Sequence, residues 1–249
     1  MNLRAVIIDI YKTLLEVGPP QDVTATWERL WRNHLQTAPR LGPDEFRVQA
    51  DRVIADHHRA AKSVGIMHPE IFWPDVVQEV LPELRQLPAL VRDDFLFEQT
   101  KCWHSTRLMP GAPAVLKTLV TAGVPLGIAS NSQSYTLREM DLALHGSEFT
   151  RESFRPDLSF FSYAHGFSKP DAHVFRDLSA RLALLGIAPA ETLMVGDRLD
   201  NDILPARLQG WQTWQLKAEP DHGAGPGGSW SALGEWLVDR ITSARDSTA

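Results

Sequence analysis

The sequence has little of what marks a secreted, membrane-bound or nucleic-acid-binding protein. Among its 249 residues there is one cysteine, Cys102, so no internal disulfide can form, which suits a reducing cytoplasm. The formal net charge is −6 and no basic block is present, which gives no electrostatic reason to expect nucleic-acid binding. The chain begins without a charged leader and has no apolar run that approaches a membrane span. We therefore expect a soluble cytoplasmic protein without a membrane partner.

Two common kinds of metal site are also missing. The histidines form no His-Glu-x-x-His pattern, which excludes the helical zinc site of that type. The acidic residues near the C-terminal third lack the spacing and central glycine of a calcium-binding EF-hand loop.

What the chain does have is a buried strand that ends in a carboxylate. Residues 5–8 (Ala-Val-Ile-Ile) are apolar and mostly β-branched, which predicts a strand buried on both faces of a parallel sheet. Asp9 follows at once, and open α/β sheets bind ligands at the carboxyl ends of their strands. Taken alone, Asp9 is equally well explained as the cap of a turn.

Three further segments follow the first one, residues 5–13 (AVIIDIYKT), at suitable intervals. They are residues 126–131 (LGIASN), 167–171 (FSKPD) and 193–202 (LMVGDRLDND). With this set the sequence resembles the haloacid dehalogenase-like hydrolase superfamily. That family has, in order, strand-Asp, strand-Ser/Thr, Lys, and strand-Gly-Asp with a second Asp five residues on. The resemblance runs from about residue 3 to residue 214.

Hydrophobic periodicity predicts an α/β fold with a helical insertion. Between about residues 18 and 107 apolar residues recur at helical spacing and no strand is evident. From residue 109 onward strands alternate with helices, which predicts a doubly wound parallel (Rossmann-like) sheet. We expect a core domain at residues 1–16 and 107–249 and an all-helical cap domain at residues 17–106. The resemblance implies that this cap closes over the active site.

The expected elements of the core can be placed by their apolar patterns and glycine breaks. We expect strands at residues 124–129, 160–163, 193–195 and 212–216, helices at residues 112–121, 132–144, 174–186, 203–208 and 230–241, and a glycine-rich surface loop at residues 222–229.

The resemblance assigns catalytic roles to residues at the strand ends. Asp9 would be the nucleophile that becomes an aspartyl-phosphate, and Thr13 would turn its hydroxyl and backbone N–H toward the same site. Ser130 can donate a hydrogen bond to a phosphoryl oxygen, and Asn131 either does likewise or caps the next helix. Lys169 would be the cation of the site, although a lone lysine before a helix is ordinarily a solvated surface residue.

The last motif gathers carboxylates on one loop. Hard oxygen ligands of this kind suit Mg²⁺. By resemblance the metal is held by Asp197 and Asp202, with Asp9 and the backbone carbonyl of Tyr11 completing the set. Asp200 falls between the two family positions and is expected to face solvent.

The presence of tyrosine at position 11 leaves three interpretations of the function open. Most phosphatases of the family carry at this place a second Asp that protonates the leaving oxygen, and tyrosine is a poor acid at neutral pH. An Asp-x-Tyr-x-Thr-Leu string resembles the 2-haloacid dehalogenases of the superfamily, which need no metal. Lys12 also stands where the family usually has Gly. We expect a Mg²⁺-dependent phosphatase acting on a small phosphorylated metabolite; the alternatives are a 2-haloacid dehalogenase-like hydrolase and a non-catalytic binding protein.

The inserted helical unit carries no motif that identifies a substrate. His68 and Trp73 either line the substrate pocket or belong to the surface or core of the cap, and the second interpretation is favoured. Trp27, Trp31 and Trp103 are most simply cap core. The expected partner is a small-molecule substrate, and the expected assembly is a monomer or a homodimer.

Overall fold

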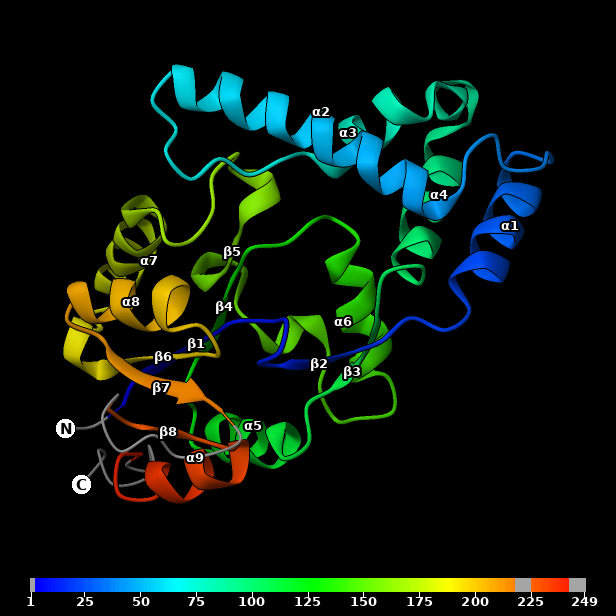
Figure 1. Cartoon of the computed structure of the whole chain (residues 1–249). Helices are drawn as coiled ribbons and strands as arrows, with labels where there is room; N and C mark the ends of the chain where they lie inside the picture. Colours follow the sequence, from blue (N-terminus) through cyan, green and yellow to red (C-terminus); the bar gives the residue numbers. More distant parts are fainter. Residues whose placement is uncertain (1–2, 218–224, 242–249) are drawn as a thin grey trace.

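A parallel sheet forms the centre of the molecule. The computed structural model describes residues 3–217 and 225–241. Within these residues the main sheet has the strand order β5-β4-β1-β6-β7-β8, and each neighbouring pair is parallel (Figure 1). Its strands are β1 (Ala5–Ile8), β4 (Leu126–Ser130), β5 (Phe160–Phe161), β6 (Thr192–Gly196), β7 (Gln212–Leu216) and β8 (Gly227–Gly228). The predicted doubly wound α/β fold is confirmed.

Helices cover both faces of this sheet because successive residues of β1 point to opposite sides. Val6 and Ile8 pack in one core with α5 (Ala112–Thr121), α6 (Thr136–Leu144) and α9 (Trp230–Leu237). Ile7 packs in another core with α7 (Ala172–Leu184) and α8 (Leu204–Leu208). An apolar run buried on both faces thus holds the strand that delivers Asp9.

The inserted segment forms a helical layer with its own core. It contains α1 (Val23–His34), α2 (Pro43–Ser63), α3 (Trp73–Val80) and α4 (Ala89–Thr100), which lie beyond the strand ends in Figure 1. Trp27 and Trp31 are buried in its centre and Trp103 packs against them, as expected. The domain boundaries at residues 16/17 and 106/107 stay a prediction. No helix within residues 3–217 and 225–241 is long and apolar enough to cross a membrane.

The expectation that no strand occurs between residues 18 and 107 is wrong at both ends of that range. β2 (Leu15–Gly18) pairs antiparallel with β3 (Ser105–Leu108), so the chain leaves and re-enters the core through a two-stranded ribbon. Opposite each other on this ribbon, Glu16 and Arg107 form an ion pair of 2.5 Å. Both strands are only four residues long and mostly part-exposed. β2 (Leu-Glu-Val-Gly) is too short to establish an alternation, and β3 (Ser-Thr-Arg-Leu) is largely polar, so neither is identified by its apolar pattern.

Several other boundaries differ from those expected; for example, β4 begins at Leu126 rather than residue 124 and β5 ends at Phe161 rather than residue 163. α6 begins at Thr136 rather than residue 132, because the N–H of Ser132 donates to Ser162 Oγ and the N–H of Gln133 donates to Thr136 Oγ1. The expected surface loop contains β8, whose two glycines pair with β7, while residues 222–224 lie outside the described residues. α9 ends at Leu237 rather than residue 241.

Close packing of β4 makes Gly127 a test of this core. A Cβ at Gly127 would lie 2.1 Å from the carbonyl oxygen of Leu158 and 2.7 Å from Ile7 Cδ1. Gly127→Ala should therefore lower the free energy of unfolding by about 1–3 kcal/mol or more, the range for overpacking a core, in a urea titration. Gly42→Ala is the matched control, since a Cβ at that position would meet no heavy atom within 4 Å; it should change stability by less than about 1 kcal/mol. An unchanged urea midpoint for Gly127→Ala would contradict the packing of β4.

Candidate active site

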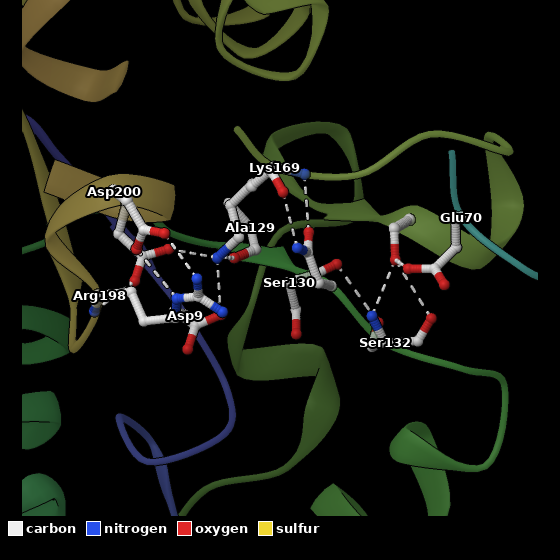
Figure 2. A network of polar contacts seen from close by, with 11 residues as sticks. Asp9, Glu70, Ala129, Ser130, Ser132, Lys169, Arg198 and Asp200 are labelled. Atoms are coloured by element: carbon white, nitrogen blue, oxygen red, sulfur yellow. Dashed lines mark hydrogen bonds and ion pairs between the residues drawn. The ribbon is translucent and has the colours of Figure 1, made fainter. Parts of the chain in front are cut away.

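The carboxyl ends of three neighbouring strands bring the expected residues together. Asp9 follows β1, Ser130 ends β4 and Asp197 follows β6, so the parallel arrangement places all three at one edge of the sheet. Lys169 comes from the loop before α7, and Asp202 comes from a π-helical turn (Leu199–Ile203) after β6. Figure 2 shows Lys169 beside Asp9 and the Ala129 carbonyl, with Ser130 next to them.

Lys169 is the centre of this group. Its side chain is 2% exposed, and its Nζ lies 2.7 Å from Asp9 Oδ1, 2.5 Å from Asp202 Oδ1 and 2.6 Å from the carbonyl oxygen of Ala129 (Figure 2). Burial opposes the charge of Lys169, but the two carboxylates outweigh burial and raise its pKa. An ammonium has three donors, and here all three are used within the protein. Lys169 is not the solvated lysine that its sequence context would ordinarily suggest.

The close approach of Asp202 explains why the Gly-Asp motif has a glycine at residue 196. A Cβ at Gly196 would lie 2.4 Å from Asp202 Oδ2, so a larger residue would displace this carboxylate. Asp202 is buried, and its Oδ2 accepts a hydrogen bond of 3.0 Å from the backbone N–H of Arg198. Asp200 points away: its side chain is 65% exposed and bound at 2.6 Å and 3.0 Å to the guanidinium of Arg198. The expectation that Asp200 faces solvent agrees with this geometry.

Three carboxylates form a group that fits a divalent cation. Asp9, Asp197 and Asp202 each offer an oxygen, and these oxygens lie within 4.8 Å of one another. One lysine faces them, which leaves negative charge uncompensated in a buried place. Burial raises the pKa of Asp9 to about 6 despite Lys169, with Asp202 and Asp197 adding to the rise. Burial and Asp202 also raise the pKa of Asp197. Hard oxygen ligands and excess negative charge suit Mg²⁺; the carbonyl of Tyr11 as a further ligand stays a prediction.

Two hydroxyls among the predicted site residues, those of Thr13 and Ser130, have no partner in the described part of the protein. The side chains of Thr13 and Ser130 are fully buried, and within the described residues neither hydroxyl has a hydrogen-bond partner. A buried hydroxyl without a partner costs about 1–3 kcal/mol, so these two, one on the loop after β1 and one at the end of β4, indicate that a bound group supplies their partners. The backbone N–H of Thr13 is different from what we expected: it donates to the carbonyl of Ile10 at 3.2 Å and closes the turn.

Asn131 holds Lys169 in place. Its Nδ2 donates to the Lys169 carbonyl at 2.8 Å, and its Oδ1 accepts from the Lys169 N–H at 2.8 Å. These two bonds use one donor and one acceptor of its amide, and α6 begins five residues later, at Thr136, so Asn131 does not cap that helix. The expected contact with substrate is therefore secondary to fixing the lysine. The sequence carried no signal for this role, because the two residues are 38 positions apart.

Tyr11 is bound to α6 through its hydroxyl. The hydroxyl donates to Glu139 Oε2 and lies 2.8 Å from Thr136 Oγ1. Glu139 is buried, and its other oxygen lies 2.7 Å from Nε2 of His104. Burial and Glu139 raise the pKa of Tyr11 far above its usual range. Tyr11 therefore keeps its proton. Glu139 and His104 were missed by sequence reasoning because no motif surrounds either of them.

A cavity of about 530 Å³ lies beside the loop after β1, between the sheet end and the helical unit. It is lined by Tyr11, Lys12, Val17, Glu70, Ile71, Trp73, His104, Asn131, Ser132, Gln133 and Tyr135. Trp73 thus both lines the cavity and packs against the core of the helical unit, so the two interpretations of this residue are not exclusive. His68 is not among the lining residues.

Gln133 fastens the helical unit to the edge of this cavity. Its Oε1 accepts from the N–H of Trp73 and its Nε2 donates to the carbonyl of Ile71, each at 2.9 Å. Glu70 accepts from Ser162 Oγ at 2.5 Å and from Gln133 Nε2 at 3.2 Å (Figure 2 shows Glu70 and Ser132 in this network). The segment at residues 70–73 is therefore held next to the loop that carries Ser130.

Comparison with known sequences identifies relatives of this chain. The sequence model of the family described as haloacid dehalogenase-like hydrolase matches residues 3–210. A Xenopus laevis protein, haloacid dehalogenase-like hydrolase domain-containing protein 3, is 21% identical over 224 residues, which cover 87% of this chain and 85% of the relative.

Solved structures with the same fold include enzymes of two kinds. A 2-haloacid dehalogenase from Pseudomonas syringae superposes with a TM-score of 0.63 at 18% identity, over 95% of this chain and 99% of that one. A HAD phosphatase from Thermococcus onnurineus gives a TM-score of 0.60 at 19% identity, over 96% and 100%. The HAD-hydrolase YfnB from Bacillus subtilis, bound to magnesium, gives 0.52 at 22% identity, over 96% and 100%. At these identities the likeness shows the fold and leaves the reaction open.

The raised pKa of Asp9 makes metal binding depend on pH. Since a carboxylate must be ionised to hold the metal, Mg²⁺ affinity should be at least about tenfold weaker at pH 5 than at pH 7.5, as one group with a pKa of about 6 requires. Because this pKa is raised in the folded protein, ionising Asp9 costs stability as pH rises from 3.8 to about 6, and bound Mg²⁺ should restore it. Isothermal titration calorimetry measures the affinity.

Two loop variants control for this experiment. Asp202→Asn removes a buried carboxylate of the group and should abolish the Mg²⁺ signal, whereas Asp200→Asn changes an exposed carboxylate and should keep the native affinity and pH profile. An affinity that does not change between pH 5 and pH 7.5 would contradict the raised pKa values.

Proposed function

Because this chain belongs to the haloacid dehalogenase-like hydrolases, we propose that it is a Mg²⁺-dependent phosphatase that acts on a small phosphorylated metabolite through an aspartyl-phosphate. The observation that carries the proposal is the group of three carboxylates, Asp9, Asp197 and Asp202, around one fully bonded lysine. A metal-independent hydrolase has no use for this excess of buried negative charge. The magnesium-bound relative supports the choice of metal.

Asp9 is oriented for nucleophilic attack. Its Oδ1 is held by Lys169, and no hydrogen bond from the described residues reaches its other oxygen. That free oxygen would attack phosphorus, the ester oxygen would leave with the bonding electron pair, and water would then hydrolyse the acyl phosphate to restore Asp9. The hydroxyls of Thr13 and Ser130 would donate to the phosphoryl oxygens.

The remaining carboxylates would hold the metal. Asp9, Asp197 and Asp202 would bind Mg²⁺, which supplies positive charge for the phosphoryl oxygens when it is bound. Lys169 has no donor left for the phosphoryl group, so its part is to keep Asp9 and Asp202 ionised and in place.

The leaving group receives no proton from residue 11. Tyr11 donates its hydroxyl proton to Glu139, and its raised pKa opposes release of that proton at neutral pH. The substrate should therefore have a leaving oxygen that is stable as an anion, as aryl and acyl phosphates do.

Tyr11 also favours a second candidate, the hydrolysis of 2-haloacids. There Asp9 would displace halide from carbon 2, and water would hydrolyse the resulting ester; halide needs no proton to leave. Dehalogenases are among the similar structures. Three clustered carboxylates are the feature that this reaction leaves unused. A non-catalytic role in the same cleft is the third candidate.

Metal dependence separates these candidates. With 4-nitrophenyl phosphate, turnover should fall by about 100-fold or more in EDTA and return with Mg²⁺, because a catalytic metal contributes several kcal/mol. Asp9→Asn should reduce turnover to background while urea unfolding shows an intact fold; Asp200→Asn should keep native turnover. Hydrolysis of 2-chloropropionate in EDTA would instead support the dehalogenase, and turnover of neither compound would support the non-catalytic role.

The position of the Tyr11 proton predicts how rate depends on the leaving group. For a series of phosphate monoesters, log kcat/KM should fall steeply as the pKa of the leaving alcohol rises, because no side chain at residue 11 protonates it. Tyr11→Phe should leave this slope unchanged. A flat plot for the native enzyme would show that another group donates the proton, and a steeper plot for Tyr11→Phe would show that Tyr11 itself does.

A further inference from the structure

Lys12 occupies a backbone conformation that its side chain disfavours. Its φ is 60°, in the left-handed region that glycine adopts freely and other residues rarely do. It stands three residues after Asp9, in a turn fixed by the Lys12 N–H bond to the Leu15 carbonyl and the Thr13 N–H bond to the Ile10 carbonyl. A glycine would relieve the strain, so a lysine here indicates a use for the side chain.

The side chain of Lys12 is a free cation at the active-site cavity. It lines the cavity of about 530 Å³. Among the described residues that line this cavity there is no other lysine or arginine. Within the described chain no hydrogen bond or ion pair holds its ammonium. Lys169, in contrast, has every donor occupied.

The other polar side chains of the cavity are mostly bound to the protein. Glu70 and Gln133 bind each other and the chain around them, and Tyr11 binds Glu139. Tyr135 is an exception: within the described residues its hydroxyl has no partner, and burial raises its pKa, so that it stays a neutral donor. The cavity thus offers a ligand one positive charge, from Lys12, and one hydroxyl.

We propose that Lys12 determines specificity by binding a carboxylate on the leaving-group part of the substrate. This rests on the proposed phosphatase function. The phosphoryl group would occupy the carboxylate cluster with its metal and the hydroxyls of Thr13 and Ser130, whereas the cavity beside Lys12 would hold the rest of the molecule. A single ammonium matches a group with one negative charge; a second phosphate would leave charge unpaired next to Glu70. The preferred substrate is therefore a phosphorylated small carboxylic acid.

Two matched aryl phosphates test the proposal. The native enzyme should prefer 3-carboxyphenyl phosphate to 3-carbamoylphenyl phosphate, which has the same shape without the charge. Lys12→Met keeps the length of the stem and removes the ammonium. It should lower the ratio of kcat/KM for the two compounds by about 10- to 100-fold, the range for a charge-assisted hydrogen bond. Lys117→Met removes an exposed lysine of α5 that pairs with Glu148 and should keep the native ratio.

The Lys12→Gly variant distinguishes a role of the Lys12 side chain in substrate binding from a role in the stability of the fold. It should lower the same ratio while raising the thermal unfolding temperature above that of Lys12→Met, because glycine adopts the positive φ without strain. A structural role for Lys12 would give variants that affect both compounds equally, and that result, or a native preference for the carboxamide, would overturn the proposal.

Binding measurements distinguish failure of this proposal from failure of the phosphatase function. If the native enzyme with Mg²⁺ hydrolyses neither compound, the proposed function is wrong. Calorimetric affinities for the two compounds in the Asp9→Asn protein, with and without Lys12→Met, then decide the matter. Selective weakening of the carboxylate by about 10- to 100-fold supports Lys12 as its binding residue, and equal weakening rejects it.

Discussion

The structure depends on one buried ammonium placed between two carboxylates. Removing Lys169 would leave Asp9 and Asp202 as buried, uncompensated charges, and breaking a buried pair in this way costs about 3–5 kcal/mol. Its position is set from several directions: the Ala129 carbonyl at the end of β4 accepts one proton, and Asn131 holds both polar groups of its backbone. The ends of β1 and β4 and the loop after β6 are thereby fixed to one another at the place where a ligand would bind.

This interaction neutralises only part of the site and leaves several groups near it unsatisfied. Asp9 keeps a raised pKa, the hydroxyls of Thr13 and Ser130 lack partners within the described residues, and Lys12 holds a strained φ of 60°. Three of these features belong to residues 9–13, the loop that the apolar strand β1 anchors. Such unsatisfied groups persist only where the surrounding structure forces them. Strand β1 therefore supplies the stability. The loop at residues 9–13 keeps charged and polar groups that a metal and an anionic ligand would satisfy.

The functional groups that directly follow buried strands could be predicted from the sequence. Those whose contacts join segments far apart in the chain could not. The apolar run at residues 5–8 predicted β1 and the position of Asp9, and the glycine before Asp197 carried a packing reason that the structure supplies in Asp202. Glu139 gave no comparable signal: it is a polar residue in an amphipathic helix, and only the folded chain shows that it lies buried against Tyr11. The ribbon of β2 and β3 was missed for a related reason, since its pairing joins two four-residue segments about 90 residues apart.

Tyr11 belongs to a hydrogen-bonded group of side chains that also contains Glu139 and His104. Its hydroxyl reaches Glu139 on α6, and Glu139 in turn binds His104, the residue just before β3, where the helical unit rejoins the core. An aspartate at position 11 is too short to span the same distance, and it would place a second carboxylate on the side of the buried Glu139. Such a residue would leave His104 and Thr136 without their present geometry. The loop after β1 and the base of the helical unit are thus linked through Tyr11, so a substitution at position 11 alters the contacts of Glu139 and His104 as well.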